Sequence, residues 1–233
     1  MKVAVPPGNV QAGARAARYA ALDKWHRDVG AAALLTAHHA DDQAETLLMR
    51  LNRGSGVSGL AGIRQKTHIP QSRGLLLRPL LGWTKSELEQ IVADAGITPV
   101  RDPSNEDDRF DRARLRKALA DADWLDTRSL ALSALNLQDT DDALDQLAQD
   151  EWEKCTAPDQ DALIYRPRYM QISVAARVIC RAMEHLGSKA SMPSAVQLAQ
   201  ALNRDETANA GGILATPKAD AWELRREPPR ASS

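Results

Sequence analysis

The sequence predicts an α/β fold with a parallel sheet, followed by a mostly helical region, and two observations lead to this prediction. Short apolar runs alternate with helical segments across residues 1–122, which is typical of strand–helix–strand units in a parallel sheet. After Trp124 the apolar positions recur mainly at helical spacing. We therefore predict an α/β domain over residues 1–122. A helical linker or substrate domain that ends in a short β hairpin is predicted over residues 123–233.

Individual signals mark the ends of the predicted elements. Asn9 is a suitable N-cap for a helix that Gly30 ends. Residues 31–37 form a short apolar run of the kind found in buried strands. The capping box Thr84-x-x-Glu87 begins another helix. The predicted helices are 9–29, 40–52, 84–95, a basic helix ending near 120, 126–155, 173–187 and 192–203; the predicted strands are 31–37, 75–81, 98–100, 211–216 and 221–226. A flexible glycine-rich turn is expected at 53–59.

Composition limits the classes of function. The chain has 233 residues and a net charge of −1, so only local basic clusters could bind nucleic acid. Its two cysteines, Cys155 and Cys180, lack C-x-x-C spacing, which argues against a zinc ribbon or a disulfide scaffold and favours a reducing cytoplasm. No apolar run is long enough to span a bilayer, so no membrane partner is expected.

The densest group of chemically active side chains is the segment His38-His39-Ala40-Asp41-Asp42-Gln43-Ala44-Glu45-Thr46, which follows the first predicted strand. Asp41 and Asp42 lie four and three positions before Glu45, so the three acids cluster at a helix start, near the sheet edge where α/β proteins bind ligands. Clustered acids need a cation, and Mg²⁺, a substrate ammonium or an arginine would serve. The histidines could instead be one packed and one solvated side chain. A zinc site is disfavoured because adjacent histidines rarely share one tetrahedral ion.

Two basic features follow. Arg53 begins the glycine-rich turn, which is either a simple helix end or a loop whose amides meet phosphate. Arg109, Arg112 and Arg116 recur at helical spacing beside Phe110, the only phenylalanine. They form either a solvated helix face or a stripe that holds phosphates bidentately.

Three segments resemble the tRNA(Ile)-lysidine synthase family, in order and in approximate spacing. The resemblance covers residues 8–117, and Gly211–Leu214 followed by Trp222 resembles the family's closing strands. The segments are Gly8–Ala12 with Arg15, Arg18 and Tyr19; His38–Thr46 running through Arg50–Leu60; and Arg78–Leu81 followed by Asp102–Asn105 and Phe110–Arg112.

The resemblance implies an N-type ATP pyrophosphatase fold, here as a partial doubly wound parallel sheet. It implies a ligase that uses ATP and Mg²⁺ to adenylate the wobble cytidine of tRNA(Ile) and then joins L-lysine to it, giving lysidine. The implied roles are as follows: catalysis by Asp41, Asp42, Glu45 and Arg112; lysine binding by Asp42 and Glu45; ATP binding by Arg18, His38, His39, Asp41 and Arg112; tRNA contact by Arg53, Arg109 and Arg116; Mg²⁺ binding by Asp41. Oligomeric state stays open, with a homodimer as one option.

Two departures from the family pattern bear on activity. The sequence contains no Ser-Gly-Gly-x-Asp-Ser phosphate loop, and Ala113 stands where the family often has asparagine. We expect a chain truncated at its N-terminus, with little or no activity alone. Two alternatives remain: a catalytically dead tRNA-binding remnant, and a tRNA thiolation ATP pyrophosphatase. The second is disfavoured because both cysteines lie in the helical region.

Overall fold

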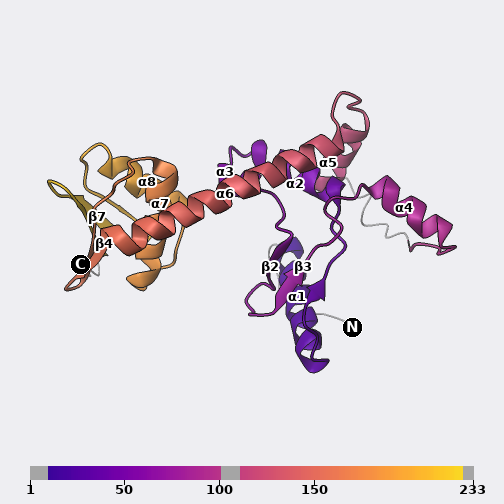
Figure 1. Cartoon of the computed structure of the whole chain (residues 1–233), viewed down its shortest axis with the longest axis horizontal. Helices are drawn as coiled ribbons and strands as arrows, with labels where there is room; N and C mark the ends of the chain where they lie inside the picture. Colours follow the sequence, from indigo (N-terminus) through magenta and orange to yellow (C-terminus); the bar gives the residue numbers. More distant parts are fainter. Residues whose placement is uncertain (1–9, 101–110, 228–233) are drawn as a thin grey trace. The chain divides into compact units, whose positions relative to one another are not determined.

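The computed structural model describes residues 10–100 and 111–227 (Figure 1). It divides into two compact units, Met1–Asp139 and Thr140–Ser233. The division lies within the long helix α6 (Thr127–Cys155), later in the chain than the predicted boundary between residues 122 and 123. The predicted Arg109 and Phe110 lie outside the described residues, as does the Asn9 cap.

A small mixed sheet forms the centre of the first unit. Its strand order is β1-β3-β2, where β1 is Leu34–Leu35, β2 is Lys66–His68 and β3 is Leu75–Leu77. Strands β1 and β3 are parallel, with Leu34 opposite Leu76, whereas β2 runs antiparallel to β3. Tyr19 from α1 (Val10–Asp28) packs on this sheet with Leu34, Ile69 and Leu76, which are all buried.

The helices of the first unit follow the predicted order. Thr84 caps α4 through the predicted capping box, with its Oγ1 accepting from the Glu87 N–H at 3.3 Å and Glu87 Oε2 accepting from the Thr84 N–H at 2.8 Å. Backbone and side-chain bonds from Thr84, together with Arg128, hold the pKa of Glu87 down at about 2. The remaining helices are α2 (Ala40–Leu51), α3 (Val57–Leu60), α4 (Lys85–Asp94) and α5 (Asp111–Ala120).

Three predictions for the first unit are wrong in detail. The predicted buried strand 31–37 is reduced to Leu34–Leu35, where Leu34 is buried but Leu35 is 62% exposed. Residues 98–100 form no strand, and Val100 is 95% exposed because no strand lies beside it. The spacing of Ala44, Leu47, Leu48 and Leu51 predicts a buried helical stripe, but Leu51 is exposed in the last turn of α2, where the buried residues end at Leu47.

The second unit contains a five-stranded antiparallel sheet beside its helices, of which only the terminal hairpin was predicted. Five antiparallel strands lie in the order β4-β5-β8-β7-β6, and the predicted terminal hairpin is confirmed as β7 and β8. The bounds are β4 Thr156–Asp159, β5 Ala162–Tyr165, β6 Ala208–Ala210, β7 Ile213–Pro217 and β8 Trp222–Arg226, with helices α7 Ile172–His185 and α8 Met192–Leu202. Strands of three or four residues carry too few alternating positions to be recognised against helical neighbours.

The sheet and helices of the second unit enclose one apolar core. Tyr165 and Trp222 meet edge to face with ring centroids 5.5 Å apart, and α7 packs against α8 (Figure 1). Two charged groups are buried at its edge: the Glu151 carboxylate, bonded by Tyr165 and Arg168, and the Arg177 guanidinium, paired with Asp141. Within residues 10–100 and 111–227, no helix is long and apolar enough to cross a membrane.

Candidate functional site

The acidic segment lies at the start of α2, where the chain leaves β1. The backbone N–H of Ala40 donates to the carbonyl of Trp83 at 2.8 Å, which fixes this start beside the segment leading to α4. His39 is the N-cap residue, and its N–H donates to Asp42 Oδ2 at 3.2 Å. Thr46 Oγ1 donates to the Asp42 carbonyl at 2.7 Å. Acids in the first turn are favoured by the helix dipole, so the local sequence stabilises the arrangement.

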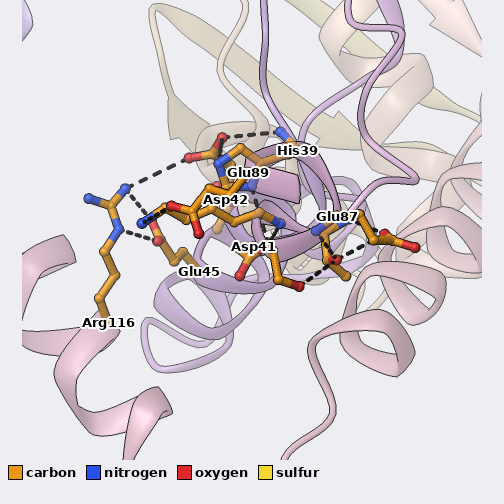
Figure 2. Close-up of polar contacts among 11 residues, drawn as sticks. His39, Asp41, Asp42, Glu45, Glu87, Glu89 and Arg116 are labelled. Atoms are coloured by element: carbon orange, nitrogen blue, oxygen red, sulfur yellow. Dashed lines mark hydrogen bonds and ion pairs between the residues drawn. The ribbon is translucent and has the colours of Figure 1, made fainter. Parts of the chain in front are cut away.

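Glu45 is the most deeply buried acid of the group, with its side chain only 2% exposed. It points toward Arg116 from α5, which approaches from a separate helix (Figure 2). Arg116 Nε pairs with Glu45 Oε1, and its Nη2 donates to Oε2 at 3.3 Å while lying 3.8 Å from Asp42 Oδ1. Burial alone would lower the pKa of Arg116, but the bond to Glu45 and the charges of Glu45 and Asp42 outweigh it and raise that pKa. The buried carboxylate is thus neutralised by a guanidinium.

Asp41 connects α2 to α4. Its Oδ2 accepts the backbone N–H of Lys85 at 2.8 Å and lies 3.3 Å from His39 Nδ1. His39 Nε2 in turn lies 3.5 Å from Asp42 Oδ2, so the imidazole sits between two carboxylates. These contacts hold both acids in place at the entrance of the site.

Two cavities open on the start of α2. The first, of about 530 Å³, has acids and cations on its walls together with apolar groups: His39, Asp41, Ala44, Glu45, Lys85, Arg116, Leu119 and Thr127. The second, of about 370 Å³, is rich in arginine: Arg15, Arg18, Tyr19, Leu22, Thr36, Ala37, His38, Asp42 and Arg112. Three guanidinium groups in one hollow suit a multiply charged anion.

Arg112 links the second cavity to the acids. Its Nη2 donates to Thr46 Oγ1 at 3.3 Å, and its Nε lies 4.0 Å from Glu45 Oε2. The Arg15 guanidinium stacks on Tyr19 at 5.2 Å from the ring centroid, with Tyr19 buried against the sheet. The arginines of this cavity are therefore held by α1 and α5, and they face His38.

His38 is kept neutral by its surroundings. Burial lowers its pKa below 6.5, and Arg78, Arg15 and Arg112 lower it further, while Asp42 acts in the opposite direction. Its Nδ1 lies 3.0 Å from Thr36 Oγ1, a bond that suits a neutral ring. A neutral imidazole does not repel the neighbouring arginines. The positive charge on the walls of this cavity therefore comes from the arginines and not from His38.

Lowering the pH through the range below 6.5 should destabilise the chain through His38. The folded state binds this proton less readily than the unfolded state, so the contribution is complete above pH 6.5 and is lost as the pH falls toward the folded pKa. Urea unfolding on both sides of pH 6.5 measures it. The His38→Gln variant should show a smaller loss of stability on acidification, whereas His68→Gln, at an exposed position, should match the parent chain. Equal pH dependence in all three chains would contradict this prediction.

The glycine-rich segment after α2 includes the short helix α3, and side chains of α2 bond to the backbone at and beyond its end. The fully buried side chain of Gln43 accepts from the Ile63 N–H at 2.6 Å and donates to the Ile63 carbonyl at 3.2 Å. Arg50 Nη1 donates to the carbonyls of Gly59 and Gly62, at 2.6 and 3.0 Å. The helix supplies side-chain bonds that a loop of small residues cannot make for itself.

Gly62→Ala should unfold this segment more readily than Gly54→Ala. Both glycines have φ of +67°, but a Cβ at Gly62 would lie 2.5 Å from Gln43 Oε1, whereas at Gly54 it would meet nothing within 4 Å. We expect a loss of about 1 kcal/mol at Gly54 from backbone strain and about 2–3 kcal/mol at Gly62. Urea unfolding of the two variants gives the difference, and equal losses would show that Gln43 does not restrain the loop.

The chain is similar to known proteins over most of its length. A family model described as PP-loop domain matches residues 1–122. A tRNA(Ile)-lysidine synthase of Novosphingobium aromaticivorans is 40% identical over 225 residues, which cover 96% of this chain and 69% of that protein. The chain belongs to the tRNA(Ile)-lysidine synthase family. The synthase of Zymomonas mobilis is 36% identical, covering 95% of this chain and 68% of that protein, and the synthase of Ruegeria pomeroyi is 36% identical, covering 89% and 51%.

Because the chain belongs to the lysidine synthase family, the linings of the two cavities can be compared with the residues predicted to bind ATP and lysine. The residues predicted to bind ATP divide between them: Arg18, His38 and Arg112 line the arginine-rich cavity, whereas His39 and Asp41 line the mixed one. The predicted lysine-binding pair also divides, with Asp42 on the arginine-rich cavity and Glu45 on the mixed one. Asp42 and Glu45 nevertheless lie close together, because both contact Arg116.

Of the predicted tRNA contacts, Arg53 lies exposed in the turn after α2, whereas Arg116 turns to Glu45. Sequence reasoning missed Lys85 as a lining residue of the mixed cavity and did not assign Arg15 to the arginine-rich one. The capping box at Thr84 could have indicated Lys85, since it puts that residue in a first helical turn. Arg15 stands one helical turn before Arg18 and Tyr19.

In the described part of the chain, no three histidine, cysteine or acidic side chains lie close enough together to hold a metal ion. Asp41, the predicted ligand, is engaged by the Lys85 N–H and His39. Mg²⁺ that is bound mainly through ATP phosphates needs only one or two protein carboxylates, so Asp41 as its ligand stays a prediction.

Proposed function

We propose that this chain is a lysidine-forming ligase acting on the wobble cytidine of tRNA(Ile), with ATP and L-lysine as co-substrates. In the first step the C2 carbonyl oxygen of cytidine attacks the α-phosphorus of ATP, and pyrophosphate leaves. In the second the ε-amine of lysine attacks C2, loses a proton, and AMP leaves with the oxygen. The observation that supports this best is an acidic cluster around buried Glu45, next to an arginine-rich cavity, in a chain of this family.

ATP fits the arginine-rich cavity. Arg18 and Arg112 face the same hollow as His38, and bidentate guanidinium groups bind phosphate oxygens well. In the adenylation step negative charge grows on the phosphoryl oxygens and on the departing pyrophosphate. Arginines fixed at that place stabilise the charge without having to reorganise. We further propose that β1 and β3 belong to a doubly wound parallel sheet, at whose edge the nucleotide binds.

Lysine fits beside Asp42 and Glu45. Two carboxylates at the start of α2 neutralise an ammonium group and fix the direction of the lysine chain. Asp42 lines the arginine-rich cavity and lies 3.8 Å from Arg116, which lines the mixed one, so an amine held beside Asp42 would lie next to the activated nucleotide. Arg53, exposed on the turn after α2, and Arg109 are the proposed tRNA contacts.

A test of the proposal combines ATP, labelled L-lysine and unmodified tRNA(Ile). It is run with this chain and with a version lengthened at its N-terminus by the Ser-Gly-Gly-x-Asp-Ser segment of a related synthase, since residues 1–233 contain no such element. Label in the tRNA of the lengthened version is the expected result, with little in the shorter one. No label in either chain would refute the ligase. The alternative of a catalytically inactive tRNA-binding protein would then gain support if tRNA bound and ATP did not.

A further inference from the structure

The mixed cavity differs from a simple cation site in carrying both signs of charge. Asp41 and Glu45 line it with Arg116 and Lys85, while Ala44 contributes an apolar wall. A site for an ammonium alone has no use for a guanidinium and a second ammonium on its walls, because both would repel it. A ligand with a carboxylate at one end and an ammonium at the other suits these walls. Free amino acids have this pattern of charge.

Arg116 has the capacity to bind a second carboxylate. A guanidinium has about five N–H donors, and its Nε and Nη2 groups already serve Glu45. Its side chain remains 41% exposed and lines the cavity. Because Glu45 is buried and grips one edge of the guanidinium, the plane of Arg116 is fixed before any ligand arrives, which lowers the entropy lost on binding.

Glu45 keeps acceptor capacity for an ammonium in the same arrangement. Its two oxygens offer about four lone-pair positions. The bond to Arg116 Nε uses one position on Oε1, and the bond to Nη2 uses one on Oε2. Asp41 and Asp42 add further negative charge close by. The cavity can therefore bind both ends of a zwitterion without first breaking the Arg116–Glu45 pair.

We infer that Arg116 binds the α-carboxylate of the amino acid substrate in the mixed cavity, with Ala44 and Leu119 along its methylene stem, and so selects a free amino acid over a plain diamine. This inference rests on the proposed lysine-dependent ligation and adds the group that recognises the carboxylate. Lys85, whose ammonium pairs with Glu89 at 3.4 Å on an exposed surface, contributes a second positive charge at the rim.

The test compares L-lysine with cadaverine, which keeps both ammonium groups and the stem but lacks the carboxylate. Calorimetric titration of the parent chain should give at least about tenfold tighter binding of lysine, the size expected for one charge-assisted pair. Arg116→Gln should abolish the preference for lysine by weakening lysine binding, while cadaverine should bind no more weakly than to the parent chain, because the variant no longer repels an ammonium. Arg116→Lys should restore part of the preference, because it keeps the charge and loses the bidentate geometry. Arg114→Gln, on the exposed side of the same helix, is the matched control and should leave both affinities unchanged.

Three results would overturn the inference. Equal weakening of lysine and cadaverine in Arg116→Gln would show that Arg116 only braces Glu45. Tighter lysine binding in that variant would show that Arg116 blocks the ammonium position. The absence of saturable lysine binding to the parent chain would show that lysine is not a ligand of this cavity. If Arg116→Gln still formed lysidine and still preferred lysine over cadaverine, the role of Arg116 would be refuted but the ligase would stand. If the chain preferred lysine through Arg116 but did not modify tRNA, the ligase would be refuted but the role of Arg116 would stand.

Discussion

Replacing Glu45 by glutamine is expected to lower lysidine formation by about a hundredfold or more. The Glu45 carboxylate is 2% exposed and pairs with Arg116, so the substitution removes the negative charge from a desolvated place and leaves the Arg116 guanidinium, which is 41% exposed, short of its partner. Losing one member of such a pair costs about 2–5 kcal/mol, and 1.4 kcal/mol corresponds to about tenfold in rate or affinity. Glutamine has nearly the same shape, which keeps the packing of α2 against α5.

The two steps of the proposed reaction respond differently to Glu45→Gln. Incorporation of labelled lysine into tRNA should fall, because the ammonium loses its deepest carboxylate. Pyrophosphate release in the presence of ATP and tRNA should persist, because the arginine-rich cavity does not include Glu45. Both are measured in the lengthened version of the chain. Glu89→Gln on α4 is the control, since Glu89 is 64% exposed and pairs only at the surface. Unchanged lysine incorporation in Glu45→Gln would contradict the proposed lysine site.

The start of α2 could be predicted from the sequence because its determinants are local. An apolar run, an N-cap position and acids in the first turn lie within a few residues of one another, and the structure confirms a helix over Ala40–Leu51. The clustering of Asp41, Asp42 and Glu45 follows from helical spacing alone. The capping box at Thr84 is of the same kind, and both of its bonds are present.

The partner of Glu45 could not be predicted, because it depends on tertiary packing. Arg116 is 71 residues away in sequence, and its spacing from Arg112 equally suits a solvated face that contacts tRNA. The division of the site into two cavities also depends on how α1, α4 and α5 surround α2. The five-stranded sheet of the second unit was missed for a related reason: β4 and β5 join at Gln160, whose φ of +52° gives no glycine signal in the sequence.

Removing the buried charge of Arg177 should destabilise the second unit more than any surface change. Its side chain is 6% exposed, and it pairs with Asp141, whose side chain is 5% exposed, and at 2.7 Å with Asp145. Its Nη1 also donates to the Ser173 carbonyl at 2.6 Å. Arg177→Met fills similar space but leaves the Asp141 carboxylate buried without its guanidinium, at a cost of about 3–5 kcal/mol. Hydrogen exchange of α7 amides should therefore accelerate by about a hundredfold or more.

A double replacement separates the missing charge from the missing contacts. In Arg177→Met with Asp141→Leu no unpaired buried carboxylate remains, so most of the lost protection of α7 should return, because well-packed apolar groups often replace a buried ion pair without loss. Arg181→Met is the matched control on the same helix; its Nε donates to the uncharged Gln149 at 3.0 Å, and its loss should cost about 1 kcal/mol. If the double variant exchanged as fast as Arg177→Met, the destabilisation would come from lost packing and hydrogen bonds and not from a stranded charge. In that case the pair would serve to position α7 against α6, and its electrostatic energy would contribute little.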